Sequence, residues 1–443
     1  MNSLLKQIGI ANDSFVLLTV GELIKQKIIE KPLDGNHGEI HPKGGDFVET
    51  GVPFIMASDI KEGHIDYGRC KYITSMQADG LRKGFAKNGD VLLTHKATIG
   101  RTALVEYSDH PYVMLTPQVT YYRITNSKKL NNLYLKYYFD SELFQKTINL
   151  WAGSGATRAY IGITAQHALP IILPPIKTQR KIAAILSAYD DMIENSERQV
   201  LIFETMAEEI YREWFVRFRF PGYKDAEFEK GMPVHWDREK LDDLCSVIKR
   251  GVSPSYSDSS PNLVINQKCI RKGRIDLSLA RPHDTKIPEE KNIEFADALI
   301  NSTGVGTLGR VSIVEFSKSN LTVDSHVTIC RANQEKINPI YLAVTITNLQ
   351  VYFELMAAGS TGQVELNRSL IAGIKILVPP ASIQVKFSEL LQDIWRKKQN
   401  LLKSIKILNE TKNILLPRLI SGKLSLEDLD IQFPPSMVEA ETA

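Results

Sequence analysis

The motif most suggestive of chemistry is a glycine pattern in the second half of the chain. Gly304-Val305-Gly306-Thr307-Leu308-Gly309 fits G-x-G-x-x-G, with which many proteins bind a dinucleotide. Such a site needs a helix to begin in the loop, so that the helix N-terminus faces the pyrophosphate. The residues that follow, Arg310 to Val314, have the composition of a strand. We therefore predict a strand–turn–strand loop, and a nucleotide-binding enzyme that uses Gly304–Gly309 stays the alternative.

Other catalytic and metal-binding patterns are absent from the sequence. It contains no P-loop, no Gly-x-Ser-x-Gly elbow and no His-Glu-x-x-His, and its nine histidines do not cluster. The cysteines form no C-x-x-C pair, which favours reduced thiols over a metal site or disulfides. The sequence shows no signal pattern and no apolar stretch of the length that crosses a membrane. We expect a cytoplasmic chain with no catalytic residue and no metal.

Basic and amide side chains in the loops between predicted strands are the best binding candidates. Lysine and arginine neutralise phosphates, and arginine, asparagine and glutamine can pair bidentately with base edges. Because the formal net charge is only +3, a nucleic-acid surface has to be a local patch. Each candidate alone could equally be solvated surface, but the set falls on equivalent loops of two halves of the chain. The candidates are Lys61, Lys71, Lys96, Thr98, Arg101, Thr157 and Arg158 in the first half, and Gln267, Lys268, Arg271, Lys272, Arg310, Gln363, Asn367 and Arg368 in the second.

Short apolar runs bounded by turn residues predict the strands that carry these loops. In the first half the runs are 52–56, 90–93, 102–105, 119–122 and 169–173, and one helix is predicted near 131–150. A length of 443 residues allows two or three domains. Residues 1–16 and those after Gly422 are expected to be loose.

Two long segments carry a heptad pattern that is typical of coiled coils. The first runs from Ile176 to Trp214 without Pro or Gly, and a helix from Thr178 to Glu213 would be roughly 54 Å long. Apolar residues recur at alternating steps of four and three in both segments. The predicted seam is Ile182, Leu186, Tyr189, Ile193, Val200, Phe203 and Ile210 in the first segment, and Phe387, Leu391, Ile394, Leu401, Ile405, Leu408 and Leu415 in the second.

The second segment repeats the first at a distance of 205 residues, which indicates an internal duplication. Leu173-Pro174-Pro175 recurs as Val378-Pro379-Pro380, and Gln179 recurs as Gln384. The first helix is acidic and the second basic, so they favour each other over self-pairing. The alternative is that these charges are only solvated faces. Short connections favour antiparallel pairing.

At this point the chain resembles the specificity subunit of type I restriction–modification enzymes over nearly its whole length. The resemblance rests on the duplicated arrangement and on short motifs in a set order. The motifs are Gly51-Val52-Pro53-Phe54-Ile55 with Asp59-Ile60, the Gly-Asp-Val-Leu and Ile-Gly-Arg run at 89–101, Met232-Pro233-x-x-Trp236, and the run from Leu415 to Lys423. Residues 296–298 depart from the pattern, with Ala-Asp-Ala where the first copy has Gly-Asp-Val.

The resemblance implies an α+β fold with two pseudo-symmetric globular target-recognition domains separated by two long antiparallel coiled-coil helices. The expected parts are target-recognition domain 1 (1–175), helix 1 (176–216), a linker with target-recognition domain 2 (217–380), helix 2 (381–422) and a C-terminal tail (423–443). It implies a non-catalytic subunit that reads a split site in double-stranded DNA, docks two methyltransferase subunits and, through them, restriction subunits. S-adenosylmethionine, ATP and Mg would belong to those partners, and none of them to this chain. A coiled-coil protein adaptor is a second alternative.

Overall fold

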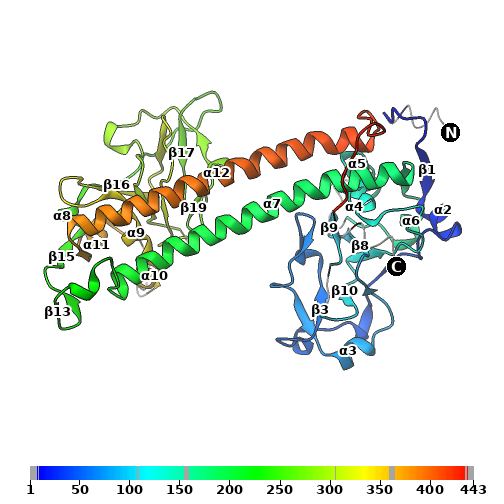
Figure 1. Cartoon of the computed structure of the whole chain (residues 1–443), viewed down its shortest axis with the longest axis horizontal. Helices are drawn as coiled ribbons and strands as arrows, with labels where there is room; N and C mark the ends of the chain where they lie inside the picture. Colours follow the sequence, from blue (N-terminus) through cyan, green and yellow to red (C-terminus); the bar gives the residue numbers. More distant parts are fainter. Residues whose placement is uncertain are drawn as a thin grey trace. The chain divides into compact units, whose positions relative to one another are not determined.

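The computed structural model describes residues 7, 9–106, 109–153, 159–304, 306–358, 365–434 and 437. The chain divides into two compact units: unit 1 comprises residues 1–195 and 405–443, and unit 2 comprises residues 196–404. Each unit contains a globular region and a part of each long helix. The long helices are α7 (Ile176–Tyr211), which continues as a π-helical turn at Arg212–Val216, and α12 (Ala381–Ile420). Figure 1 draws α7 in green and α12 in orange.

Within the described residues, unit 1 is built on two four-stranded sheets. The first has the order β2–β11–β8–β9 and is antiparallel, and the second has the order β6–β3–β10–β7, in which β3 and β10 are parallel. The pairs β1–β12 and β4–β5 complete it. The strands are β1 (Val16–Thr19), β2 (Leu33–Asp34), β3 (Val52–Ile55), β4 (Ile60–Lys61), β5 (His64–Ile65), β6 (Lys71–Ile73), β7 (Phe85–Ala86), β8 (Val91–Lys96), β9 (Thr98–Leu104), β10 (Val113–Leu115), β11 (Val119–Tyr122) and β12 (Pro170–Leu173).

The helices of unit 1 correct one prediction. The single helix expected near 131–150 was wrong, because the chain forms two helices that meet at Ser141. The backbone of Ser141 is extended, and its hydroxyl accepts a hydrogen bond from the amide of Phe144, which makes it the N-cap of the second helix. The helices are α2 (Val20–Lys25), α3 (Ser75–Asp79), α4 (Asn132–Asp140), α5 (Glu142–Trp151) and α6 (Ile163–Gln166).

Unit 2 repeats this arrangement. Its sheet β16–β24–β21–β22 matches β2–β11–β8–β9, and its sheet β20–β17–β23 again contains a parallel pair, β17 and β23. The strands are β13 (Phe228–Glu229), β14 (Met232–Pro233), β15 (Asp237–Lys240), β16 (Cys245–Arg250), β17 (Leu263–Ile265), β18 (Ile270–Arg271), β19 (Arg274–Ile275), β20 (Arg281–Pro282), β21 (Ala298–Asn301), β22 (Val311–Ile313), β23 (Leu321–Val323), β24 (Val327–Ala332) and β25 (Lys375–Val378). The helices are α8 (Leu241–Leu244), α9 (Pro339–Asn348), α10 (Gln350–Ala358) and α11 (Arg368–Ala372).

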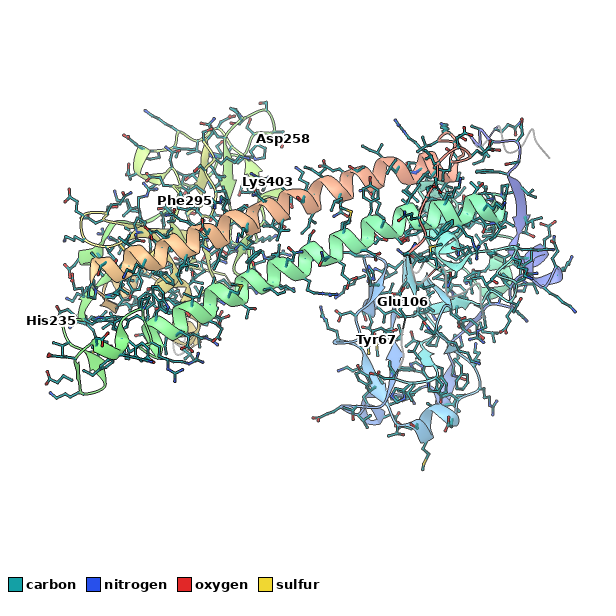
Figure 2. All side chains as sticks on the ribbon, in the orientation of Figure 1. Tyr67, Glu106, His235, Asp258, Phe295 and Lys403 are labelled. Atoms are coloured by element: carbon teal, nitrogen blue, oxygen red, sulfur yellow. The ribbon has the colours of Figure 1, made fainter. Side chains whose placement is uncertain are left out.

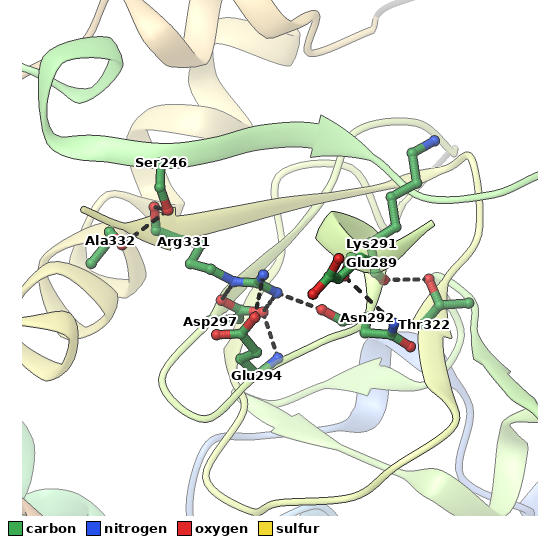
Figure 3. A network of polar contacts seen from close by, with 9 residues as sticks. All are labelled: Ser246, Glu289, Lys291, Asn292, Glu294, Asp297, Thr322, Arg331 and Ala332. Carbon is green, nitrogen blue, oxygen red and sulfur yellow. Dashed lines mark hydrogen bonds and ion pairs between the residues drawn. The ribbon is translucent and has the colours of Figure 1, made fainter. Parts of the chain in front are cut away.

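A buried arginine–aspartate pair holds the same place in both units. In unit 2, Arg331 on β24 donates from Nε and Nη2 to the two carboxylate oxygens of Asp297 at 2.9 and 2.8 Å (Figure 3). In unit 1, Arg123 contacts Asp90 in the same way at 2.9 and 2.7 Å. Ala296 has a φ of 66° where Gly89 has 84°. Both residues therefore have a left-handed backbone conformation, although the second copy has alanine where the first has glycine.

Each long helix has in its first turn a buried glutamine that binds the globular region before it. The amide oxygen of Gln179 accepts from the backbone of Asn131 at 3.0 Å, and its nitrogen donates to the carbonyl of Pro174 at 2.8 Å. Gln384 repeats both bonds, from Asn338 at 2.8 Å and to Pro379 at 2.7 Å. The same local signal therefore starts both helices.

The long helices run antiparallel in each unit. In unit 1, Lys181 contacts residues 426–429 just beyond the end of α12, whereas Asp190, farther along α7, pairs with Lys412. In unit 2, the Glu204 carboxylate lies 3.7 Å from Lys398 Nζ, and Tyr211 packs against Phe387.

The globular region of unit 2 also packs on α12. Phe295, which is labelled in Figure 2, meets Trp395 edge-on. The ring centroids are 5.9 Å apart. With short-strand sheets, connecting helices and antiparallel long helices present in both units, the predicted α+β fold class is confirmed. The predicted domain boundaries stay a prediction.

The chain ends correct a second expectation, since their described parts are not loose. Ile10 and Phe15 are 3% exposed, and Leu426 is 3% exposed in the core of unit 1. The amide of Ala11 donates to the carbonyl of Ser421, which joins the two ends of the chain. The apolar residues of these segments were too few and too irregularly spaced to predict such packing.

Candidate nucleic-acid interface

The described candidates of unit 1 are exposed, but Lys71 and Arg101 lie on strands β6 and β9 rather than in the predicted loops. Lys61 is on the β4–β5 hairpin, where its ammonium lies 3.9 Å from Asp66, and Lys71 is on β6. Lys96 and Thr98 flank the β8–β9 turn. Thr157 and Arg158 lie outside the described residues.

Arg101 has a structural contact that the sequence did not reveal. Its Nη1 donates to the carbonyl oxygens of Ala57 and Ile60 at 3.1 and 3.2 Å. It therefore fastens β9 to the start of the β4–β5 hairpin. The ammonium of Lys96, in contrast, lies 5.9 Å from the ring centroid of Tyr160 on the exposed side.

The described candidates of unit 2 lie in three places. Lys268, Arg271 and Lys272 are exposed at the β18–β19 hairpin, where Arg271 Nε donates to the Lys268 carbonyl at 2.8 Å. Asn367 caps α11, and Arg368 lies 3.7 Å from Asp242. Asn367 and Arg368 therefore lie at the N-terminus of α11 rather than at the β18–β19 hairpin.

Gln267 and Arg310 of unit 2 contact the glycine motif. Gln267 Oε1 accepts from the Thr307 hydroxyl at 3.4 Å, and Arg310 Nη2 donates to the Gly306 carbonyl at 2.6 Å. Gln363 lies outside the described residues. The motif joins β21 to β22, so no helix begins there and the predicted strand–turn–strand loop is confirmed.

A polar cluster at the end of β2 in unit 1 was not predicted from the sequence. The Asp34 side chain is 5% exposed, forms an ion pair with Lys83 and lies 2.9 Å from His37 Nε2. The His95 ring is fully buried, with Nδ1 2.9 Å from the Ile161 carbonyl oxygen. Its Nε2 has no hydrogen-bond partner in the described part of the chain and lies 4.0 Å from Asp34 Oδ2.

Hydrogen bonds and burial set the charges in this cluster. Burial raises the pKa of Asp34, but hydrogen bonds from Lys83 and His37 outweigh it and bring the pKa below its ordinary value. Asp34 therefore stays ionised. Burial lowers the pKa of His95 by more than its hydrogen bond to Ile161 raises it, so this ring stays neutral.

Unit 2 has an ion pair of opposite polarity at the same point of its sheet. Asp34 lies opposite Thr120 in the β2–β11 ladder, and Arg250 lies opposite Thr328 in the equivalent β16–β24 ladder. Arg250 pairs with Glu365. Both positions are therefore charged, and both charges have a partner.

A glycine follows each of these two positions. A Cβ on Gly35 would lie 1.8 Å from the Leu115 carbonyl oxygen, and a Cβ on Gly251 would lie 1.8 Å from that of Val323. Only glycine fits so close to a neighbouring strand. The two glycines mark the same place in both units.

Among the described residues, no group of three or more His, Cys, Asp or Glu side chains is placed to hold a metal ion. No helix in that part of the chain is long and apolar enough to cross a membrane.

Comparison with known families decides what this duplicated architecture is. A family model described as "Type I restriction modification DNA specificity domain" matches residues 17–202 and again residues 233–412. The chain belongs to this specificity family. It is a DNA target-recognition subunit of a type I restriction–modification system and is itself not a catalytic subunit. The assignment decides against a nucleotide-binding enzyme and against a coiled-coil adaptor.

Relatives of the specificity family resemble the chain over most of its length. It is 27% identical to the type I restriction enzyme MjaIX specificity subunit of Methanocaldococcus jannaschii, over 87% of this chain and 88% of that protein. It is 22% identical to the HindI specificity subunit of Haemophilus influenzae, over 84% and 94% of the two chains. The crystal structure of the S subunit of a type I restriction–modification system from M. genitalium matches with a TM-score of 0.60 at 15% identity, over 92% and 97%. That likeness shows a shared fold.

Proposed function

We propose that unit 1 and unit 2 each read one half of a split site in double-stranded DNA. The observation that carries the proposal is the duplication of the scaffold without duplication of the loops. The arginine–aspartate pair and the helix-starting glutamine recur in both units. The charged position at the end of β2 and β16 has the opposite sign in the two units. If both units read the same bases, this position would not need opposite charges in the two units. The two halves of the DNA site therefore differ in base sequence.

The candidates then divide by the chemistry of their side chains. The exposed lysines of the two hairpins, Lys61 and Lys272, are suited to phosphates, which fix position without reading sequence. Gln267 and Arg310 carry groups that can pair bidentately with a base edge, and they lie beside one turn in unit 2.

Replacement of Arg101 or Arg310, which hold equivalent places after the two β-turns, tests the proposal. The complex of the chain with its methyltransferase partners selects sites from randomised duplexes. We expect Arg310→Ala to change the preference in one half only, and Arg101→Ala to act on the other half only. Loss of a base contact costs about 1–3 kcal/mol at one position, and loss of a phosphate contact weakens binding uniformly. Lys318→Ala, at an exposed position in unit 2, controls for the lost charge. A change in both halves from one substitution contradicts independent reading.

The exposed face of the long helices is the proposed docking surface for two methyltransferase subunits. Ile202 on α7 is 51% exposed and Ile407 on α12 is 61% exposed, and the two positions are equivalent in the duplication. Because an exposed isoleucine recurs at the same helical position, the surface suits two copies of one partner. Restriction subunits would bind through these partners. S-adenosylmethionine, ATP and Mg²⁺ would bind to partner subunits rather than to this chain, in the cytoplasm.

The number of bound methyltransferase subunits tests this docking surface. Ile202→Asp and Ile407→Asp should each remove one partner copy, because a carboxylate would be buried in the interface without a counter-ion. Native mass spectrometry counts the copies. Gln199→Asp and Ser404→Asp add the same charge at exposed positions that are also equivalent in the duplication. Equal loss in the control variants, or two partners bound to both isoleucine variants, would refute the assignment.

A further inference from the structure

The two units place opposite charges at one and the same point of their sheets. The strand registers fix the equivalence, since Asp34 and Arg250 lie opposite threonines that hold the same place in the two ladders. The neighbouring contacts also correspond: the amide of Ile161 donates to the carbonyl of His95, and that of Leu366 donates to that of Ser302. The backbone around the position is therefore the same, while the side chains differ in kind.

The fold does not require either charge. At this end of the sheet, unit 1 has the carboxylate of Asp34 and unit 2 has the guanidinium of Arg250. The sheet therefore forms with either sign of charge at this position. A buried carboxylate costs several kcal/mol unless it is paired. The buried His95 Nε2 without a partner adds a further cost. Side chains that are kept against such costs are typical of binding sites.

In unit 1 the buried carboxylate positions two donors near the surface. Asp34 is 5% exposed and both of its oxygens are occupied, so it cannot itself reach a ligand. Its partners are more accessible, with side chains 33% exposed at Lys83 and 54% exposed at His37. Asp34 fixes where these two donors point.

In unit 2 the donor itself holds the sheet position. Arg250 is 33% exposed, and it is held from two sides by the Glu365 carboxylate and the Leu366 carbonyl oxygen, the latter at 3.3 Å from Nη2. An arginine oriented in this way presents its remaining N–H groups in a fixed fork.

We propose that Lys83 with His37 in unit 1, and Arg250 in unit 2, donate hydrogen bonds to a guanine edge in their half of the DNA site. Guanine offers two adjacent acceptors, O6 and N7, in the major groove, and lysine and arginine are their usual partners. Asp34 and Glu365 are positioning residues that hold these donors. The inference rests on the proposal that each unit reads one half-site, and it names the base-reading residues of that function.

Site selection by the complete complex with its methyltransferase partners tests the inference. Lys83→Gln should lower the preference for guanine at one position of one half by roughly 5- to 150-fold, and Arg250→Gln should do so at one position of the other half. Asp34→Asn, which keeps the shape of the side chain, should lower the same preference as Lys83→Gln. The double variant should be no worse than either single one, because both changes disable the same contact. Thermal unfolding of each variant shows that the fold is kept.

The outcomes separate base reading from the other roles. Lys128→Gln and Lys318→Gln remove one positive charge from exposed loops of the same units and serve as controls. A uniform loss of affinity with a shallower salt dependence would show a phosphate contact and overturn the inference. An unchanged base preference, or a change in both halves from one substitution, would overturn it as well. If the wild-type complex selects no two-part site, the proposal that each unit reads one half-site is wrong. That outcome is visible in the wild type without any variant, so it is distinct from a failure of this inference.

Discussion

Removal of Arg331 from its pair with Asp297 should destabilise unit 2 and leave unit 1 unchanged. Arg331 binds Asp297 through two nitrogens, donates to the Asn292 carbonyl at 2.5 Å and pairs with Glu294 at 2.5 Å (Figure 3). Arg331→Met would leave the Asp297 carboxylate without a counter-ion in a place where it is 1% exposed.

The size of the effect follows from burial and geometry. Because Glu294 is 56% exposed, its ion pair with Arg331 contributes little to stability. The Asp297 side chain, in contrast, is only 1% exposed, so its pair with Arg331 is shielded from water. Breaking one partner of a buried pair costs about 3–5 kcal/mol, but replacing both partners with apolar residues is often neutral. We therefore expect Arg331→Met to lower the free energy of unfolding of unit 2 by about 3–5 kcal/mol, and Asp297→Leu with Arg331→Met to restore most of it.

Hydrogen exchange read on separate peptides of the two units measures this change locally. The amides of β21 and β24 should exchange faster in Arg331→Met, while those of β8 and β11 stay protected. Arg123→Met is the matched variant, since Arg123 makes the same pair with Asp90 in unit 1, and the pattern should be reversed there. A loss below about 1 kcal/mol, or equal deprotection of both units, would show that the pair does not hold its own unit together.

Three further predictions concern single buried contacts. Gln384→Leu should destabilise unit 2 by about 1–3 kcal/mol in urea unfolding, because the Asn338 amide then loses its partner, and Gln179→Leu should do the same in unit 1. The pKa of His95 is lower folded than unfolded, so its stability contribution is full above the unfolded pKa and is lost as pH falls. Between about pH 7.5 and about pH 5.5 unit 1 should lose at most about 1.4 kcal/mol in urea unfolding, and His95→Asn should lessen that loss. Lys181→Met should speed proteolysis after residue 422, because the Lys181 ammonium binds three carbonyl oxygens of residues 426–429.

Local signals account for what the sequence predicted well. The Pro-Pro pairs and the glutamines lie within a few residues of the two helix starts, the heptad steps follow along each helix, and both long helices form there. The glycine motif was read correctly because the composition after it, not the motif itself, decides between helix and strand. The break at Ser141 was missed because its neighbours are good helix formers on both sides, and one capping hydroxyl decides the geometry.

The cluster around Asp34 could not be predicted, because its members come from distant parts of the chain. Lys83 lies 49 residues after Asp34, and His95 is bound to Ile161, 66 residues farther on. Strand β2 has only two residues, too few for any alternation of apolar and polar residues. Only the ladder register of the folded sheet shows that Asp34 and Arg250 are equivalent.

The glycines beside these residues explain how recognition can diverge on a fixed scaffold. Gly35 and Gly251 approach a neighbouring carbonyl so closely that no other residue fits, and this contact sets the backbone of the residue just before each of them. The position of Asp34 or Arg250 is therefore fixed by the glycine and by the strand ladder, not by its own side chain. A change of side chain at that point therefore leaves the sheet in place. The same reasoning predicts that Gly35→Ala should destabilise unit 1 more than Lys83→Gln does, because the added methyl group would clash with the Leu115 carbonyl although no charge changes. A comparison of the thermal unfolding of the two variants tests this prediction, and a larger loss in Lys83→Gln would contradict it.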